Sequence, residues 1–352
     1  MSELYLIIPE EPSYTLSKMI DTVAENWNTV IIENEHNIPD LRNKKIVFAV
    51  ELNDAGISLG LDKILTEIFK RGKQSLYGSI GSVLIHSNTE LHTKTVAQGI
   101  IFLTNQLGLS FPGRPLVEAT GSLRNFLTMQ KVSKKPLIDV CIESCKELST
   151  RLKEYKASIL ENPNILVLHA SNRTTSNSLM LWDKVKKNLS DYAINEINIE
   201  NGTVKDCIGC SYKVCKHYGQ QTSCFYGGIM VEEVYPAILD SDIVIWICPN
   251  YNDAISANLS AVINRLTALF RKTKFYDKSF FSIIVSGNSG SDSVAKQLIS
   301  ALNINKTFRL PPYFSLMATA NDKGTIMELP NIGDEAKEFA MNIIRNFKYK
   351  NG

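Results

Sequence analysis

The segment Ile243–Arg265 reads IVIWICPNYNDAISANLSAVINR and predicts a strand, a loop and a helix in succession. Its first five residues are all apolar rather than alternately apolar, which is typical of a central parallel strand covered on both faces. The loop 249–252 follows at the carboxyl end of that strand. Ligands of open α/β sheets bind outside the carboxyl ends of the strands, so this loop is the first candidate for a binding site.

Strand-like and helix-like segments alternate on both sides of this stretch, which predicts parallel sheets with helices on both faces. The expected strands are 4–8, 29–32, 46–50, 82–86, 165–169, 193–199, 243–248 and 281–286. The expected helices are 16–27, 61–71, 96–107, 178–189, 259–270 and 294–302. Asn162-Pro163-Asn164 ends a helix-compatible segment, so we expect two α/β domains, 1–161 and 162–352.

Short matches recur at a nearly constant spacing, which predicts that the two domains are copies of each other. Asn53-Asp54-Ala55 returns as Asn252-Asp253-Ala254, an offset of 252 − 53 = 199. A register held to within one residue over some seventy positions is hard to attribute to chance. Further matches occur at an offset of 199 for Pro112, Ala119 and Thr120, and at an offset of 200 for Ser82 and Asn88.

The bulk composition excludes several classes of protein. A formal net charge of +2, without a stripe of Lys and Arg interleaved with aromatics, argues against a nucleic-acid binder. No apolar run approaches the roughly 20 residues that span a bilayer, and the chain begins with a strand-like segment rather than a signal peptide. We therefore expect a cytoplasmic protein. Its seven cysteines are an odd number and favour metal, redox or thiol chemistry over a disulfide framework.

The loops after the first strand of the two domains differ in charge. In the second domain, residues 170–178 read ASNRTTSNS and offer hydroxyls, amides, a guanidinium and a helix N-terminus, a set suited to a phosphate. In the first domain, residues 9–13 read PEEPS, and their two carboxylates would repel one. Simple helix capping is the alternative for the second loop, because Ser, Thr and Asn are preferred N-caps. The first domain is expected to be a degenerate copy without a phosphate loop.

Residues 164–347 resemble the flavodoxin-like NAD(P)H-dependent FMN reductases, including their iron–sulfur flavoprotein branch. That family has a Gly-Ser-x-Arg-x-x-Ser-x-Ser/Thr loop after its first strand, which residues 170–178 match with Ala170 in place of glycine. Its Ser-Pro-x-Tyr loop and the helix end Asp-Arg are matched by Cys248-Pro249-Asn250-Tyr251 and Asn264-Arg265. With the internal repeat, the resemblance implies two tandem flavodoxin-like, doubly wound parallel sheets, each a three-layer α/β/α domain.

The resemblance also implies that the second domain binds FMN. The phosphate is expected on Ser171, Arg173, Ser176, Asn177 and Ser178. The isoalloxazine ring is expected against Pro249, Asn250, Tyr251 and Asn252, with a third contact from Ser286, Gly287 and Asn288. No dinucleotide or nucleoside-triphosphate fingerprint is present in the sequence. No catalytic side chain is expected, because the flavin carries the chemistry and solvent supplies protons.

Four of the seven cysteines lie in one stretch of the second domain, 207–224. Thiolates from one loop can hold an iron–sulfur cluster or a structural zinc. The iron–sulfur branch uses a tighter C-x2-C-x2-C followed by a fourth cysteine, and many reductases of the family keep some of these cysteines as free thiols. A [4Fe–4S] cluster, zinc and free thiols therefore stay open for Cys207, Cys210, Cys215 and Cys224. Packing in the core is the interpretation favoured for Cys141, Cys145 and Cys248.

The expected function is NAD(P)H-dependent flavin oxidoreduction. Hydride would pass from NAD(P)H as co-substrate to the flavin, and then to a quinone, a nitro or azo compound, free flavin or a redox protein. One alternative is an iron–sulfur flavoprotein that acts as an electron-transfer protein. Another is a non-catalytic flavin or redox sensor. The chain could also pair with a second copy as a homodimer.

Overall fold

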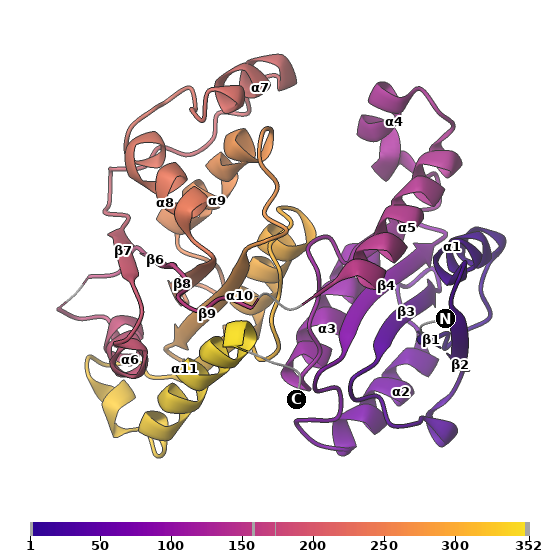
Figure 1. The fold of residues 1–352 in the computed structure, drawn as a ribbon, viewed down its shortest axis with the longest axis horizontal. Helices are drawn as coiled ribbons and strands as arrows, with labels where there is room; N and C mark the ends of the chain where they lie inside the picture. The colour runs from indigo at the N-terminus through magenta and orange to yellow at the C-terminus, as the bar shows by residue number, and fades with distance from the viewer. Residues whose placement is uncertain (1–2, 157–158, 173, 349–352) are drawn as a thin grey trace. The chain divides into compact units, whose positions relative to one another are not determined.

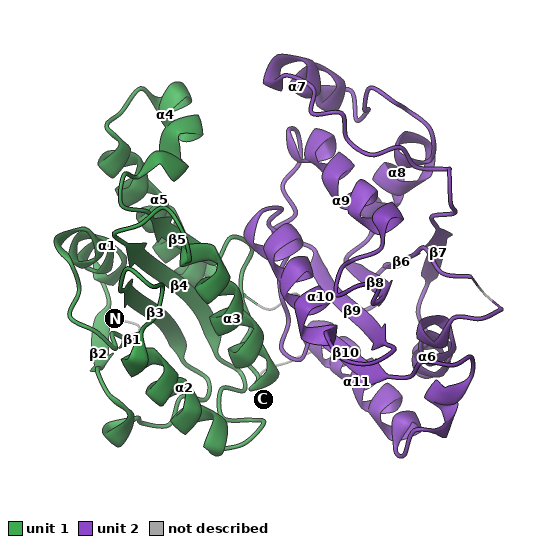
Figure 2. Ribbon diagram, turned by 180° about the vertical axis from the view of Figure 1, so that it is seen from behind, with its two compact units in different colours: residues 1–156 green, residues 157–352 purple. Residues whose placement is uncertain are grey.

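The computed structural model describes residues 3–156, 159–172 and 174–348, which form two compact units, 1–156 and 157–352 (Figures 1 and 2). Each unit has one five-stranded sheet in which every pair of neighbouring strands is parallel. The strand order is β2-β1-β3-β4-β5 in unit 1 and β7-β6-β8-β9-β10 in unit 2. The predicted fold class, two flavodoxin-like α/β sheets, is confirmed.

Unit 1 wraps its helices around both faces of its sheet. Its strands are β1 (Glu3–Ile7), β2 (Asn28–Ile32), β3 (Lys45–Leu52), β4 (Ile80–Ser87) and β5 (Leu116–Ala119). Its α-helices are α1 (Tyr14–Ala24), α2 (Leu59–Lys70), α3 (Thr93–Gln106), α4 (Leu127–Ser133) and α5 (Leu137–Glu154). Helices α1 and α5 pack together and share one apolar core with β1, β3, β4 and β5. The crossovers after β3 and β4 run in the opposite direction from the first crossover, which puts α2 and α3 on the other face.

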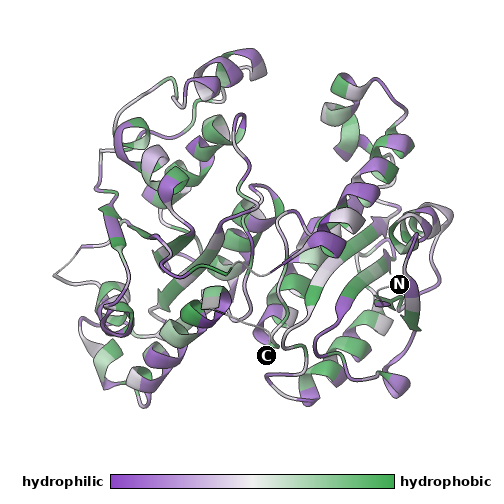
Figure 3. Cartoon of the chain, viewed as in Figure 1, coloured by the Kyte–Doolittle hydropathy of each residue, from purple (hydrophilic) through white to green (hydrophobic). Residues whose placement is uncertain are grey.

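Unit 2 has the same plan. Its strands are β6 (Ile165–His169), β7 (Ile194–Asn198), β8 (Ile243–Pro249), β9 (Ser279–Ser286) and β10 (Ser315–Thr319). Its α-helices are α6 (Asn177–Lys186), α7 (Tyr212–Gln220), α8 (Tyr235–Asp240), α9 (Ala257–Phe270), α10 (Ser291–Leu298) and α11 (Ile332–Lys348). All seven residues of β8 are buried, as the uninterrupted apolar run predicts. Hydrophobic residues concentrate in the strands of both sheets (Figure 3).

Backbone hydrogen bonds near the fifth strand of each sheet recur at the spacing found in the sequence. Gly81 N donates to Ser110 O, and Phe280 N donates to Arg309 O, with 280 − 81 = 199 and 309 − 110 = 199. The bonds from Val83 N to Pro115 O and from Ser282 N to Phe314 O follow the same offset. The two sheets thus share fine detail as well as strand order. That the first half is a degenerate copy of the second stays a prediction.

None of the helices in the described part of the chain combines the length and the apolar composition needed to cross a membrane.

Candidate functional site

Three of the predicted loops leave the same edge of the unit 2 sheet. Strands β6, β8 and β9 are neighbours and run parallel, so the loops that follow His169, Pro249 and Ser286 emerge side by side. The amide of Asn250 joins two of these loops, because its Nδ2 donates to Ser286 Oγ at 3.0 Å and to Ser289 O at 2.9 Å. The sheet therefore brings the three loops predicted to bind FMN to one edge.

The loop after β6 holds a buried hydroxyl with unused hydrogen-bonding capacity. Ser171 is 3% exposed, and its Oγ has no hydrogen-bond partner among the described residues. Ser176 caps helix α6, with its Oγ accepting from Leu179 N at 3.3 Å, and Ser178 is buried in the first turn. The capping expected as the alternative is thus present, yet it leaves Ser171 unsatisfied. Arg173 lies outside the described residues.

Asn177, also predicted to bind phosphate, is occupied within the protein. Its Nδ2 donates to the carbonyl oxygens of Ala320 at 3.2 Å and Asp322 at 2.8 Å. Its Oδ1 accepts from Gly324 N at 2.8 Å. The side chain thereby fastens the start of α6 to the segment that follows β10. The sequence analysis did not foresee this role.

The loop after β8 makes a tight turn. Asn252 and Asp253 both have positive φ angles, 54° and 57°, and Tyr251 and Ala254 pair across them. Positive φ at both central residues defines a type I′ turn, for which Asn and Asp are well suited. The turn leaves the Tyr251 side chain 57% exposed at the edge where the three loops emerge. Pro249 is buried as the last residue of β8.

The loop after β9 packs tightly against the loop after β8. Gly290 has a φ of 88°, and a Cβ at this position would lie 1.8 Å from Asp253 Oδ1. Only glycine fits there. Asn250 Oδ1 is buried and, within the described chain, has no hydrogen-bond partner. Gly287 is half-buried and Asn288 exposed beside this packed junction.

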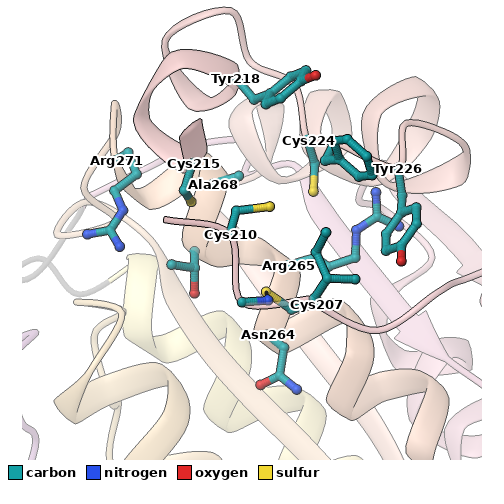
Figure 4. Close-up of a pocket in the computed structure, with 14 residues that line it drawn as sticks. Cys207, Cys210, Cys215, Tyr218, Cys224, Tyr226, Asn264, Arg265, Ala268 and Arg271 are labelled. Atoms are coloured by element: carbon teal, nitrogen blue, oxygen red, sulfur yellow. Dashed lines mark hydrogen bonds between the residues drawn. The ribbon is translucent and has the colours of Figure 1, made fainter. Parts of the chain in front are cut away.

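Cys207, Cys210, Cys215 and Cys224 surround a pocket of about 200 Å³ (Figure 4). The pocket lies between α9 and the segment 207–226, which includes α7 and is called the cysteine loop below. The lining also includes Tyr218, Phe225, Tyr226, Asn264, Arg265 and Arg271. No three His, Cys, Asp or Glu side chains in the described residues form a group that could hold one metal ion. The geometry thus gives no support to zinc.

Two residues of α9 fasten the cysteine loop, a role that the sequence analysis left unassigned. Asn264 Nδ2 donates to Asp206 Oδ1 at 2.9 Å. Arg265 is 2% exposed, and its Nη2 donates to Gly227 O at 2.7 Å. Asn264 and Arg265, noted above only as a motif match, thus hold the residues on either side of the cysteine loop. The loop is anchored to α9 as a result.

The other three cysteines are packed in the cores, as expected. Cys141, Cys145 and Cys248 are each fully buried. A hydrogen bond with Cys141, together with burial, raises the pKa of the Cys145 thiol. Burial raises the pKa of the Cys248 thiol. The thiols of Cys145 and Cys248 are therefore neutral at physiological pH.

Residues 163–322 match the family model described as NADPH-dependent FMN reductase. The matched span contains all three loops at the edge of the unit 2 sheet and the whole cysteine pocket. The predicted resemblance of the second half of the chain to this family is confirmed. With it, the predicted class of enzyme, an NAD(P)H-dependent flavin oxidoreductase, is supported.

Solved structures with distant likeness each cover about half of this chain. A quinone oxidoreductase from Methanothermobacter marburgensis has 12% identity and a TM-score of 0.41, over 52% of this chain and 98% of its own. An FMN-dependent NADH-azoreductase from Bacillus anthracis in complex with FMN has 13% identity and a TM-score of 0.37, over 51% and 99%. No curated protein sequence matches the chain.

Proposed function

We propose that unit 2 binds one FMN at the edge where the three loops emerge and uses it to oxidise NAD(P)H. The acceptor would be a quinone, a nitro or azo compound, free flavin or a redox protein. The observation that carries the proposal is the match of residues 163–322 to NADPH-dependent FMN reductases, because this span holds all three of these loops.

Two buried atoms without partners test whether these residues suit FMN. Buried polar groups are usually hydrogen-bonded, so a buried atom without a partner in a binding loop is a place where a ligand could bond. Ser171 Oγ can donate a hydrogen bond, which suits a phosphate oxygen at the start of α6. Asn250 Oδ1 can only accept, which suits a ring N–H of the isoalloxazine. The unmet donor and acceptor thus match the two ends of FMN.

The remaining residues would position the cofactor. The exposed ring of Tyr251 offers an aromatic surface at the rim. The bonds from Asn250 to Ser286 and Ser289 hold the two loops at a fixed separation. FMN, when bound, supplies the redox chemistry, since it accepts a hydride and passes electrons on. The protein's task is then to bind, orient and shield it.

The test is purification followed by release of the cofactor and anaerobic turnover. We expect one FMN per chain, identified by chromatography after denaturation, and oxidation of NADPH or NADH with menadione as acceptor. Protein free of flavin that also fails to bind added FMN would contradict the proposal. Tightly bound FMN that neither nucleotide reduces would instead favour a flavin sensor.

A second candidate is an iron–sulfur flavoprotein, favoured by the arrangement of four cysteines around one pocket. A single zinc holds each thiolate at about 2.3 Å, which brings the sulfurs to within about 4 Å of one another. A [4Fe–4S] cluster attaches each thiolate to a different iron and so separates the sulfurs more widely. The support for this candidate is that all four thiols line one pocket.

Anaerobic purification with iron and sulfide analysis tests this candidate. We expect about four irons per chain and broad visible absorbance beside the flavin bands. Cys210→Ser should remove both and leave FMN bound, whereas Cys141→Ala, in the core of unit 1, should not. Protein prepared without oxygen that holds no iron would exclude the cluster and leave four free thiols.

A further inference from the structure

The two segments that form the rim of the cysteine pocket carry many cations and no carboxylate. Residues 207–231 and 254–276 contain no Asp or Glu, although acidic residues (Asp206, Glu232, Glu233, Asp253 and Asp277) directly flank these two ranges. They contain six basic residues: Lys213, Lys216, Arg265, Arg271, Lys272 and Lys274. Because the whole chain has a formal net charge of only +2, this concentration of positive charge is a local feature of unit 2. Such a patch attracts anionic partners.

Three of these six cations, Lys213, Lys216 and Arg271, are exposed on α7 or at the end of α9, two helices that pack together. A Cβ at Gly219 would lie 2.2 Å from Ala268 O, so the glycine lets the two helices approach closely. Lys213 and Lys216 of α7 are both exposed to solvent. The guanidinium of Arg271, at the end of α9, lies 4.8 Å from the ring centroid of Tyr212 at the start of α7.

Large apolar side chains are exposed among these cations. Over residues 208–226 they are Ile208, Tyr212, Val214, Phe225 and Tyr226, with exposed fractions of 53%, 54%, 42%, 53% and 37%. We call these five residues, with Lys213, Lys216 and Arg271, the cysteine-loop surface. Aromatic and Arg side chains at the centre of an exposed patch are typical of protein interfaces. Four of its members, Ile208, Phe225, Tyr226 and Arg271, also line the cysteine pocket, where Figure 4 labels Tyr226 and Arg271.

We propose that the cysteine-loop surface docks an acidic electron-carrier protein that takes electrons from unit 2. This inference rests on the proposed function, because the electrons come from NAD(P)H through FMN. Each NADPH supplies two electrons and releases one proton, so two one-electron carriers are reduced in turn. Charge complementarity selects the partner, since cations without carboxylates favour an acidic surface.

Helix α9 connects the flavin loops with this surface. It begins at Ala257, just after the loop that follows β8, and reaches the pocket at Asn264, about two helical turns further on. A carrier on the cysteine-loop surface would therefore sit close to the proposed flavin edge. An anionic membrane fits less well, because α7 has only nine residues, its Gly219 is packed on α9, and four members of the surface line a pocket.

The test compares reduction of two haem proteins of opposite charge, acidic cytochrome b5 and basic cytochrome c. The double variant Lys213→Glu/Lys216→Glu should lower the rate of cytochrome b5 reduction about tenfold at low salt and leave menadione reduction unchanged. It should raise the rate with cytochrome c. The matched control is Lys187→Glu/Lys337→Glu, which makes the same charge change at exposed positions elsewhere in unit 2 and should alter neither rate. Lys213→Arg/Lys216→Arg should behave as wild type.

Calorimetry measures the binding of cytochrome b5 directly, so it tests the docking surface even if the chain oxidises no NAD(P)H. A loss of binding in the glutamate variant alone supports the docking surface whatever the turnover. Equal cytochrome b5 binding and reduction in both double variants would overturn the proposal. Sedimentation with phosphatidylserine vesicles that the glutamate variant abolishes, without any binding of cytochrome b5, would also overturn it and identify a membrane surface.

Discussion

The two units place different chemistry at matching positions of the same fold. In unit 1, Glu51 at the end of β3 contacts His86 at the end of β4, with Oε1 2.5 Å from Nδ1. Offsets of 250 − 51 = 199 and 286 − 86 = 200 place Asn250 and Ser286 at the corresponding positions of unit 2. There an amide donates to a hydroxyl at 3.0 Å. A carboxylate–imidazole pair in one unit thus corresponds to an amide–hydroxyl pair in the other.

The same contrast appears at the N-termini of the helices. In unit 1, Glu51 Oε2 accepts from Ser13 N at the start of α1, at 3.0 Å. Glu10 Oε1 accepts from Gly60 N at the start of α2, at 2.9 Å. Helix N-termini attract anions, and unit 1 supplies these anions from its own side chains. In unit 2 the described residues of the loop before α6 include no carboxylate, and Ser171 Oγ is unsatisfied. In unit 1 the helix N-termini are therefore bonded to the unit's own carboxylates. In unit 2 the Oγ of Ser171 remains able to bond to a ligand.

The largest expected effect comes from placing in unit 2 a carboxylate like those at the helix N-termini of unit 1. Ser171→Glu would place a carboxylate where the phosphate is proposed to bind, and like charges in a buried site repel strongly. We expect FMN to bind at least about a hundredfold more weakly, which corresponds to about 3 kcal/mol. Fluorescence titration of the flavin-free protein with FMN measures this.

Two milder variants control for damage to the loop. Ser171→Ala removes only one hydrogen bond and should weaken FMN by about 1 kcal/mol. Thr174→Ala, at an exposed position in the same loop, should have little effect on FMN affinity. Retention of FMN by Ser171→Glu at wild-type affinity would show that the phosphate binds elsewhere.

A second comparison concerns the first residue of the helix that follows the first strand of each unit. Asn177 begins α6, is 7% exposed and fastens the segment 320–324, whereas Tyr14 begins α1 and is 75% exposed. Asn177→Ala would leave buried backbone groups unpaired and should lower the free energy of unfolding by about 2 kcal/mol. Tyr14→Ala should change it by less than about 0.5 kcal/mol. Urea unfolding of both variants without FMN measures the difference, and equal losses would contradict the assigned role.

The sequence was sufficient for the central strands and for the loops at their carboxyl ends. The all-apolar residues of β8 predict a buried strand directly, and parallel neighbours bring their following loops to one edge. The fifth strands β5 and β10 were not predicted, because they are short and only partly buried. Helix α7 was also missed, because Gly219, packed against α9, is its only buried residue, so no run of buried apolar positions marks it in the sequence.

Long-range pairings were the other part that the sequence could not reveal. Asn177 bonds to partners more than 140 residues away, so its local sequence indicates only a helix start. Glu51 and His86 meet because β3 and β4 pair in that register. The two carboxylates of the PEEPS loop were expected only to repel phosphate. The structure shows Glu10 in a specific role, as the acceptor at the start of α2.

The smallest expected effect concerns the charge of the Glu51 carboxylate in unit 1. Burial by itself would raise the pKa of Glu51, but hydrogen bonds from His86 and Ser13 outweigh it, so this pKa lies below its ordinary value of 4.5. A carboxyl group whose pKa is lowered by folding stabilises the protein above its unfolded pKa, and that contribution is lost as the pH falls through the folded pKa. Glu51→Gln keeps the shape and removes the charge. It should therefore cost about 1 kcal/mol at pH 7 and almost nothing at the lowest pH at which the protein stays folded.

Hydrogen exchange of the α1 amides, followed by mass spectrometry, localises this effect to unit 1, because Ser13 at the N-terminus of α1 donates to Glu51. The comparison needs wild type and variant at each of several pH values, since the intrinsic exchange rate itself changes with pH. Asp40→Asn is the matched control: a hydrogen bond with Arg42 lowers the pKa of Asp40 to about 2, but the pair is exposed and should contribute little to stability. A difference between Glu51→Gln and wild type that persists unchanged at low pH would mean that the carboxylate charge does not stabilise α1. Packing rather than charge would then hold the Glu51 side chain at the N-terminus of α1. The difference between this site and the proposed phosphate loop of unit 2 would have no electrostatic cause.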